Sequence, residues 1–190
     1  LEPYRCHKSP FSYAECLTSL VPTRGNTLKL FTEGEEAFEA IIEAVDQAQD
    51  YVLSQFYVIR DDWAGTVFLQ RLRNAVKRGV RVHLYIDPLE SQLSESELRA
   101  LEEAGIGVAI HAPAKSVLDL FQDNFRNHRK LVVVDGKLAL LGGMNVGDNY
   151  LSREEGTSPW NDLFLRLQGP AVLNAQLGFF RDYYCFTGDR

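Results

Sequence analysis

His128 and Lys130 stand two residues apart at the head of an apolar run, and Asn145 follows further along behind a Gly-Gly pair. With Asp135 between them, the stretch reads H-x-K-x(4)-D-x(6)-G-G-x-N. In a chain of this length, six matches at fixed spacing are expected by chance on the order of once in a million. An imidazole can attack phosphorus, while an ammonium and an amide can hold the phosphoryl oxygens. The pattern therefore predicts chemistry on a phosphodiester.

Two apolar runs must hold these groups, Lys130–Val134 and Lys137–Leu141, and the Asp-Gly pair between them is a strong hairpin signal. At the head of a strand, the side chains at positions 128 and 130 face the same side. After the hairpin, Gly142 and Gly143 have no Cβ, so the backbone can approach a ligand closely. We therefore expect both glycines to contribute to substrate binding.

Each of these residues also has an ordinary structural explanation. A histidine at a strand end is often only hydrogen-bonded, and a lysine is often a solvated charge, but the spacing favours chemistry for His128. Asp135 suits an Asp-Gly turn whatever the chemistry, and Asn145 suits a helix cap. Both explanations stay open for Asp135 and Asn145.

Together these residues resemble the HKD signature of the phospholipase D superfamily. The similarity extends from about Asn26 to Arg190 and is greatest to the bacterial cardiolipin synthases within that superfamily. It includes three further stretches, Gly142–Asp148, Trp160–Asp162 and Leu167–Val172. The resemblance implies that a histidine attacks the phosphorus and forms a phosphohistidine, while the histidine of a second motif protonates the leaving alcohol.

The resemblance also assigns individual roles. His128 becomes the nucleophile, Lys130 and Asn145 bind phosphate oxygens, and Asp135 is chiefly a supporting residue. Asp162 matches a carboxylate that hydrogen-bonds the other ring nitrogen of the nucleophilic histidine, where it would fix the tautomer and stabilise the imidazolium. The alternative for Asp162 is that it only closes a loop before a strand. These five residues form the predicted catalytic set.

Two further residues are candidates for substrate binding. Asp87 ends the predicted strand Val80–Ile86, at the edge where open α/β sheets bind ligands, although an acid entering a proline turn explains it equally well. Arg126 belongs to a basic rim that suits anionic headgroups or ordinary solvation. The apolar segment Val117–Phe125, just before the motif, suits acyl-chain entry or shallow membrane contact. A helix packed on the core explains that segment equally well.

Only one HKD motif is present, whereas the resemblance implies that two must face each other. His7, His83 and His111 lack the lysine and the aspartate at the required offsets. Either the chain is the N-terminal half of a two-motif enzyme, or two copies join about a two-fold axis. The sequence does not begin with Met, which favours the first arrangement. Any membrane anchor would then lie outside this chain.

Alternating strands and helices predict an α/β fold with a mixed, largely parallel sheet that is flanked by helices on both faces. Residues 1–26 carry three prolines, Gly25 and Asn26 and are expected to form an irregular lead-in, and residues 27–190 a single domain. The expected strands are 27–31, 51–59, 80–86, 107–110, 130–134, 137–141 and 163–167. The expected helices are 35–49, 64–78, 94–104 and 171–186.

Composition excludes several classes of protein. The 190 residues include 20 basic and 26 acidic ones, a net charge of −6, which argues against a nucleic-acid partner. The three cysteines and four histidines show no metal-ligand spacing, so neither a metal nor a cofactor is expected. No apolar run approaches the ~20 residues that cross a bilayer. We expect a cytoplasmic protein, peripheral to the membrane surface.

The functional hypothesis is a phosphatidyltransferase of the cardiolipin-synthase type, acting on a phosphatidylglycerol-like phospholipid as one half of a two-motif site or as a homodimer. Phospholipid hydrolysis and nuclease action are alternatives within the same superfamily, and the net charge weighs against the nuclease. A non-catalytic lipid-binding or assembly half-module is the alternative from another class.

Overall fold

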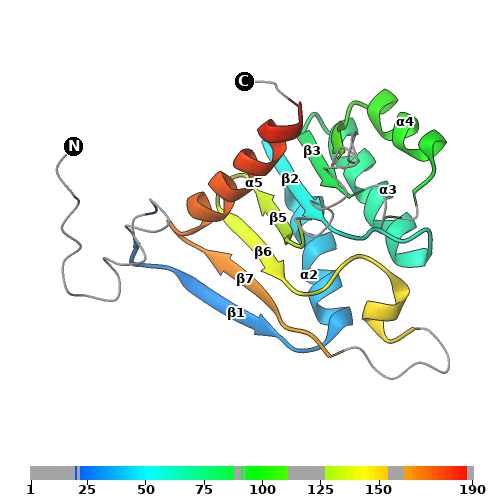
Figure 1. Ribbon diagram of the computed structural model, residues 1–190. Coiled ribbons are helices and arrows are strands. Elements are labelled where there is room, and N and C mark those ends of the chain that lie inside the picture. Colours follow the sequence, from blue (N-terminus) through cyan, green and yellow to red (C-terminus); the bar gives the residue numbers. More distant parts are fainter. Residues whose placement is uncertain are drawn as a thin grey trace, which may run out of the picture.

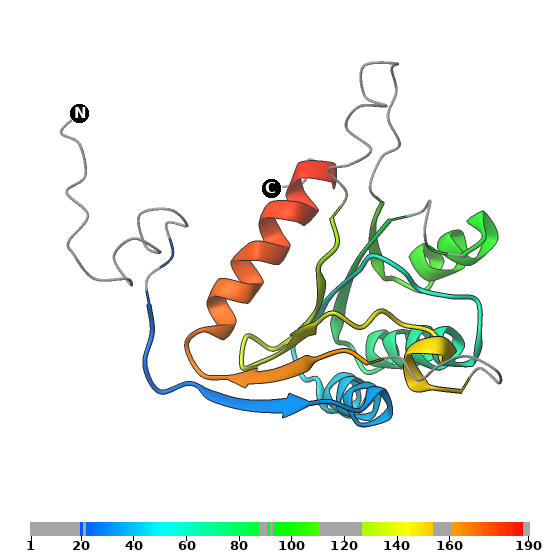
Figure 2. The ribbon, with the colours of Figure 1, turned by 60° about the horizontal axis from the view of Figure 1, so that its bottom comes forward.

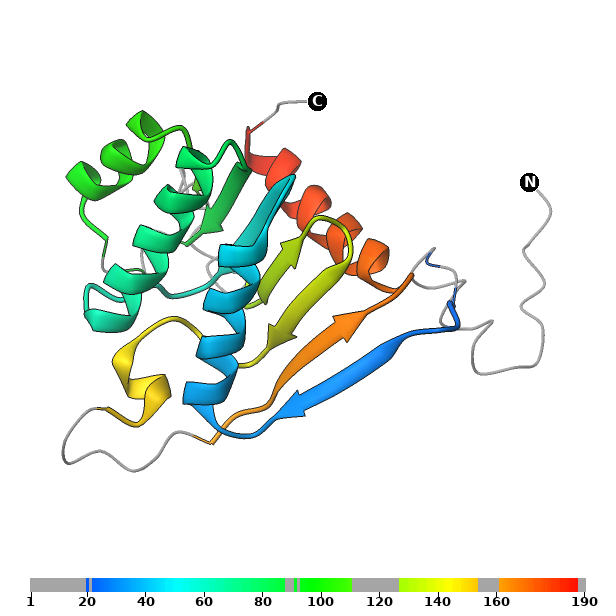
Figure 3. The same cartoon turned by 180° about the vertical axis from the view of Figure 1, so that it is seen from behind.

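The computed structural model describes residues 20, 22–87, 91, 93–110, 127–153 and 161–187. These residues form a seven-stranded sheet in the order β1-β7-β6-β5-β2-β3-β4, with helices on both faces (Figures 1 and 3). The strands are β1 (Thr27–Phe31), β2 (Tyr51–Phe56), β3 (Arg81–Ile86), β4 (Gly107–Ile110), β5 (Lys130–Val134), β6 (Leu138–Gly142) and β7 (Phe164–Gln168). The helices are α2 (Gly34–Gln47), α3 (Trp63–Lys77), α4 (Glu95–Glu103) and α5 (Val172–Thr187), with a short 3-10 helix, η2 (Asp148–Leu151).

The α/β class, the mixed sheet and the helices on both faces are confirmed, but the sheet is not largely parallel as expected. Only β2, β3 and β4 are parallel neighbours, and the other four strand pairings of the described sheet are antiparallel. The β5–β6 hairpin is the physical reason. It returns to the middle of the sheet beside β2 and runs opposite to it, and β7 and β1 continue the antiparallel order.

The two faces of the sheet bury separate apolar layers. Helices α2, α3 and α4 pack on one face through side chains that include Ile41, Phe68 and Leu101. Helix α5 packs on the other face through Phe179 and Tyr183. The apolar positions of each helix recur at the 3.6-residue period, so one stripe of each helix faces the sheet.

Strand β5 is buried along its whole length because its side chains enter both layers in alternation. Val132 and Val134 pack with the α2 and α3 layer, whereas Leu131 and Val133 pack with α5. A continuous run of branched apolar residues is what a strand covered on both faces requires. Burial therefore fixes β5 firmly, and the chain just before it carries His128.

Helix α5 covers only part of its face. It packs over β2, β4, β5 and β6, while β7 and β1 lie toward the opposite edge of the sheet (Figure 2). Leu28 and Leu30 of β1 are 64% and 53% exposed, and Leu30 pairs with Leu165 of β7. We call Leu28, Leu30 and Leu165 the open leucine face, an apolar half-face of the sheet.

The turn between β5 and β6 is held by a carboxylate. Asp135 and Gly136 both have positive φ, 52° and 62°, as a tight hairpin turn requires. The Asp135 side chain accepts backbone N–H groups from Gln49 (3.0 Å), Asp50 (2.8 Å) and Tyr51 (2.9 Å), at the start of β2. Burial alone would raise the pKa of Asp135, but these three donors lower it below its ordinary value.

We expect Asp135→Asn to lower the free energy of unfolding at neutral pH by about 1–3 kcal/mol, because hydrogen bonds to a charged group are lost. A depressed pKa contributes stability above the unfolded-state pKa, and this contribution disappears as pH falls through the folded-state pKa. Denaturant unfolding of both proteins from pH 7 to pH 3 should therefore show curves that converge in acid. A gap that does not change with pH would contradict this account of Asp135.

Candidate active site

The imidazole of His128 lies at the surface against an aromatic ring. His128 belongs to the irregular segment 127–129 before β5, and its ring stacks on Tyr57 with centroids 4.1 Å apart and planes tilted by 19°. Tyr57 follows β2, and the antiparallel pairing of Gln55 with Leu131 brings the end of β2 beside the start of β5. Two strands distant in sequence therefore fix the position of one exposed histidine ring.

Lys130 is the first residue of β5, and its side chain returns toward His128. The Lys130 Nζ donates to the backbone oxygen of His128 at 2.7 Å and lies 5.3 Å from the centre of the Tyr57 ring. Lys130 is only 9% exposed, and burial lowers its pKa while the nearby carboxylate of Asp162 opposes that shift. An ammonium has three N–H donors. The bond to His128 uses one of them, which leaves two donors for a phosphate.

Asn145 ties the chain after β6 to the chain after β2. Its Oδ1 accepts the backbone N–H of Val58 at 3.0 Å, and its Nδ2 donates to the Tyr150 hydroxyl at 2.8 Å. The expected alternative role as a helix cap does not apply, because η2 begins at Asp148 behind Gly147. The buried amide is therefore bonded to the residue that follows Tyr57 in the chain.

Asp162 packs against the open end of the β5–β6 hairpin, opposite the turn, at two glycines that have no side chain there. A Cβ on Gly143 would overlap the Asp162 carboxylate, and a Cβ on Gly142 would overlap the backbone oxygen of Leu163. Gly142 pairs with Lys130 in the sheet. We expected Gly142 and Gly143 to leave space for a ligand. The space is instead filled by residues 162–164, which place the Asp162 carboxylate near Lys130.

The remaining predicted residues lie elsewhere. Asp135 is at the opposite end of β5 from His128, and its carboxylate is bonded to the start of β2. Asp87 is buried at the end of β3 and accepts the backbone N–H of Ser91 through its backbone oxygen. Arg126 and the apolar segment Val117–Phe125 lie outside the described residues. The structure thus brings His128 and Lys130 together at Tyr57, places the Asp162 carboxylate near Lys130 and ties Asn145 to Val58, and it leaves Asp135 apart.

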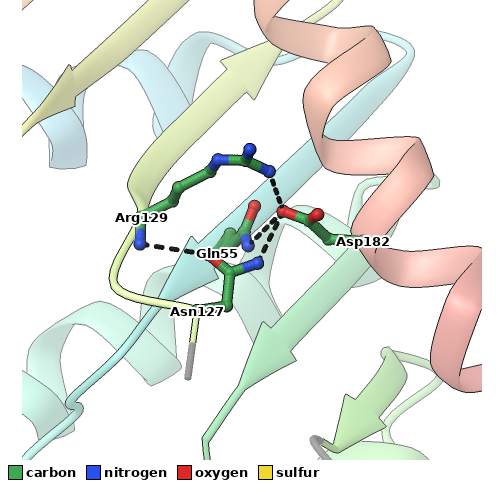
Figure 4. Close-up of polar contacts among 4 residues, drawn as sticks. All are labelled: Gln55, Asn127, Arg129 and Asp182. Carbon is green, nitrogen blue, oxygen red and sulfur yellow. Dashed lines mark hydrogen bonds and ion pairs between the residues drawn. The ribbon is translucent and has the colours of Figure 1, made fainter. Parts of the chain in front are cut away.

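A second polar cluster, which the sequence analysis did not predict, adjoins the motif. Asp182 of α5 accepts hydrogen bonds from Gln55 and Asn127 on its Oδ2 atom (Figure 4). The same oxygen forms an ion pair with Arg129. Arg129, the residue after His128, is therefore ion-paired with α5. The partners of Asp182 lie at least 53 residues away in sequence, so no local spacing signals the cluster. Tyr57 was missed for the same reason.

A groove of about 590 Å³ opens beside this site, between α5 and the β5–β6 hairpin. Its lining is largely apolar and includes Leu131 and Leu141, together with the charged residues Arg129, Lys130, Arg181 and Asp182. In the described ranges no three His, Cys, Asp or Glu side chains gather as metal ligands would. No helix among those residues is long and apolar enough to cross a bilayer.

Comparison with known proteins assigns this site to a family. The family described as "Cardiolipin synthase, PLD-like domain" matches residues 41–157. Cardiolipin synthase A of Pseudomonas putida is 39% identical over 163 residues, which are 85% of this chain and 34% of that protein. The chain belongs to this phospholipase D-like family, and it spans about a third of the length of the curated relatives it matches.

Solved structures show the same fold. NucT from Helicobacter pylori superposes with a TM-score of 0.62 at 16% identity, over 83% of this chain and 95% of that one. Nuc from Salmonella typhimurium, a phospholipase D family member, gives 0.61 at 17% identity, over 85% and 96%. The phospholipase D-like α/β fold expected from the sequence is confirmed.

The two glycines of the hairpin end allow a matched test of the site's packing. Gly142→Ala places a Cβ 2.8 Å from the Phe164 Cα as well as on the Leu163 oxygen. Because backbone cannot yield easily, we expect its free energy of unfolding to fall by about 1–3 kcal/mol. Gly143→Ala meets only a side chain, which can turn away, so it should destabilise less.

Moving the Asp162 carboxylate should instead alter Lys130. Because that carboxylate opposes the lowering of the Lys130 pKa, we expect the pKa to fall further in Gly143→Ala. Denaturant unfolding and NMR titration of labelled lysine measure the two effects. Equal stability losses in both variants, or a Lys130 pKa that rises in Gly143→Ala, would contradict the described packing.

Proposed function

We propose that this chain is half of the active site of a phosphatidyltransferase of the cardiolipin-synthase type, in which His128 forms a covalent phosphohistidine. The observation that carries the proposal is the exposed His128 ring, stacked on Tyr57, with the Lys130 ammonium bonded to the carbonyl of the same residue. A nucleophile and a cation are thereby held together at a surface that a phosphodiester can reach.

Two displacements complete the reaction. In the first, a nitrogen of His128 attacks the phosphorus of a phosphatidylglycerol-like donor, and the bond from phosphorus to the oxygen of the headgroup glycerol breaks, so that the phosphatidyl group stays on His128. A histidine of the second motif gives its proton to the leaving alkoxide. In the second, that histidine takes a proton from the acceptor hydroxyl, whose oxygen attacks phosphorus and releases His128. No net proton is consumed.

The other residues stabilise charge or hold geometry. Lys130 and the remaining N–H of the Asn145 amide face the phosphoryl oxygens. An ammonium ~4 Å from an anionic oxygen contributes roughly 4 kcal/mol of gross attraction at an effective dielectric near 20. This local attraction outweighs the diffuse net charge of −6. Asp162 balances the burial of Lys130 and orients His128, while Asp135 acts only through the hairpin turn.

Substrate binding is proposed for the surface beside the motif. Gly142 and Gly143 add no side chain at the open end of the hairpin, and the groove lined by Leu131 and Leu141 accepts part of the phospholipid. Arg126, which lies outside the described residues, is assigned to the anionic headgroup. Asp87, buried at the end of β3, is assigned to the same substrate-binding surface. The complete protein acts at the cytoplasmic membrane surface, where anionic phospholipid is presented.

The partner of this half is a second HKD half. The second histidine must come from outside the described residues, because the only other histidine among them, His83, is hydrogen-bonded to Tyr183 of α5. The open leucine face is an apolar surface of the kind that a partner covers. The curated relatives are about three times as long as the matched part, which favours a second half in the same polypeptide over a homodimer.

Three alternatives differ from the proposed transferase. A hydrolase would deliver the phosphatidyl group to water, and analysis of products in the presence of phosphatidylglycerol separates it from a transferase. A nuclease is disfavoured by the acidic composition. A non-catalytic half-module would leave the complete protein inactive on every phosphodiester, although the folded site would be intact.

We expect His128→Ala to reduce turnover of the complete enzyme by ~10⁴-fold or more, since a nucleophile has no substitute within the site. The thermal unfolding midpoint should change little, because the ring is exposed. Phosphatidyl transfer from labelled phosphatidylglycerol measures the first and calorimetry the second, with His83→Gln as the matched histidine control. Near-normal turnover in His128→Ala would refute the nucleophilic role.

The partner surface has a control built into one strand. Leu28 and Leu30 face the open side of β1, whereas Lys29 faces the other side and lies over Phe31. We expect Leu28→Glu with Leu30→Glu to lower turnover of the complete enzyme at least about tenfold, because a docked half would bury unpaired carboxylates. Lys29→Glu should have a much smaller effect. Equal losses in the two proteins would argue against docking on the open leucine face.

A further inference from the structure

We infer that Asp182 is the positioning residue of the nucleophile: one of its carboxylate oxygens binds the residues on both sides of His128 and holds that segment against α5 and β2. The inference rests on the proposed function, because it assigns Asp182 to the placement of the attacking ring. Asp182 acts on the reaction through His128 and not by contact with the reacting phosphoryl group.

The contacts converge on a single atom. Asp182 Oδ2 accepts from Asn127 Nδ2 at 2.6 Å and from Gln55 Nε2 at 2.9 Å, and it pairs with the Arg129 guanidinium (Figure 4). The Asp182 side chain is 18% exposed, against 60% for Arg129. A hydrogen bond to an ionised partner in such a shielded place is stronger than a neutral one.

The two flanking residues are also bonded to each other. Asn127 Oδ1 accepts the backbone N–H of Arg129 at 3.1 Å, which closes a tight turn with His128 at its centre. The His128 carbonyl accepts from Lys130. Hydrogen bonds or ion pairs thus hold the chain at Asn127, at the His128 carbonyl and at Arg129. It needs these bonds because residues 127–129 belong to no helix or strand.

The other ends of the cluster are rigid. Gln55 is fully buried in β2, in register with Leu131 of β5. Tyr85 of β3 is also buried beside the cluster: burial, followed by the charges of Asp182 and Asp87, raises its pKa, while a hydrogen bond with Asn127 acts in the opposite direction. The carboxylate therefore connects an irregular segment to β2 and α5, with Tyr85 of β3 beside the cluster.

Anchoring α5 is not a sufficient explanation for Asp182. Val172, Phe179 and Tyr183 already bury one side of α5 against the sheet, and Gln176 accepts a hydrogen bond from Tyr51. What Asp182 adds is a connection to Asn127 and Arg129, the immediate neighbours of His128. A displacement of ~1 Å at a reacting group can reduce a rate on the order of 100-fold, so this connection affects turnover.

The test uses the complete enzyme and phosphatidyl transfer as its readout. We expect Asp182→Ala to lower kcat about 10- to 100-fold while KM changes less than about threefold, because the ring is misplaced but the phosphate-binding groups remain. Asp182→Asn keeps an acceptor oxygen but loses the charge, so its kcat should be intermediate. The matched control is Asp46→Asn on α2, an exposed acid paired with Arg71, which should keep the normal kcat.

A double-variant cycle separates positioning from a general loss of stability. If Asp182 acts through Asn127, the Asp182→Ala, Asn127→Ala double variant should be about as slow as the slower single variant. Losses that multiply would overturn the inference, as would a normal kcat in Asp182→Ala or a change confined to KM. Should Asp182→Ala fail to fold, a normal kcat in both Asp182→Asn and Asn127→Ala would overturn it.

Failure of this inference is distinguishable from failure of the proposed function. If His128→Ala abolishes transfer while the Asp182 and Asn127 variants are normal, only the positioning role is wrong. If His128→Ala itself retains transfer, the proposed function is wrong, whatever the Asp182 variants show.

Discussion

The antiparallel pairing of β5 with β2 is the contact on which the site depends. Its register, Gln55 opposite Leu131, sets the chain that leaves β2 beside the chain that enters β5. Tyr57 and His128 then meet as stacked rings. The pairing is stable because β5 is buried on both faces by branched apolar side chains. A shift of one residue would turn Lys130 to the other face of the sheet and dismantle the site.

Much of the site could be predicted because its signals are local. His128 and Lys130 share a side through their two-residue spacing, and an Asp-Gly turn between apolar runs sets the hairpin. Tyr57, Gln55 and Asp182 carry no such signal, since each meets the motif only after the sheet and α5 have assembled. Hydrophobic periodicity located the helices and strands closely, but it does not encode strand direction, so the largely antiparallel sheet was not foreseen.

The H-x-K-x(4)-D motif places residues at both ends of β5, and Asp135 lies at the end away from His128. Its spacing from His128 is the length of β5, so the imidazole lies at one end and the carboxylate at the other. The acid holds the start of β2 through three backbone donors. Since β2 is the strand that presents Tyr57 beyond its other end, the turn and the predicted nucleophile depend on the same strand pair. A fixed sequence spacing can thus reflect folding geometry as well as chemistry.

Locating the covalent intermediate tests the central claim most directly. The complete enzyme would be mixed with labelled phosphatidylglycerol, quenched within one turnover, digested, and analysed by mass spectrometry under conditions that preserve phosphohistidine. We expect the phosphatidyl group on the peptide that contains His128. A label found reproducibly on another residue, or transfer at full rate with no labelled peptide at any quench time, would contradict it.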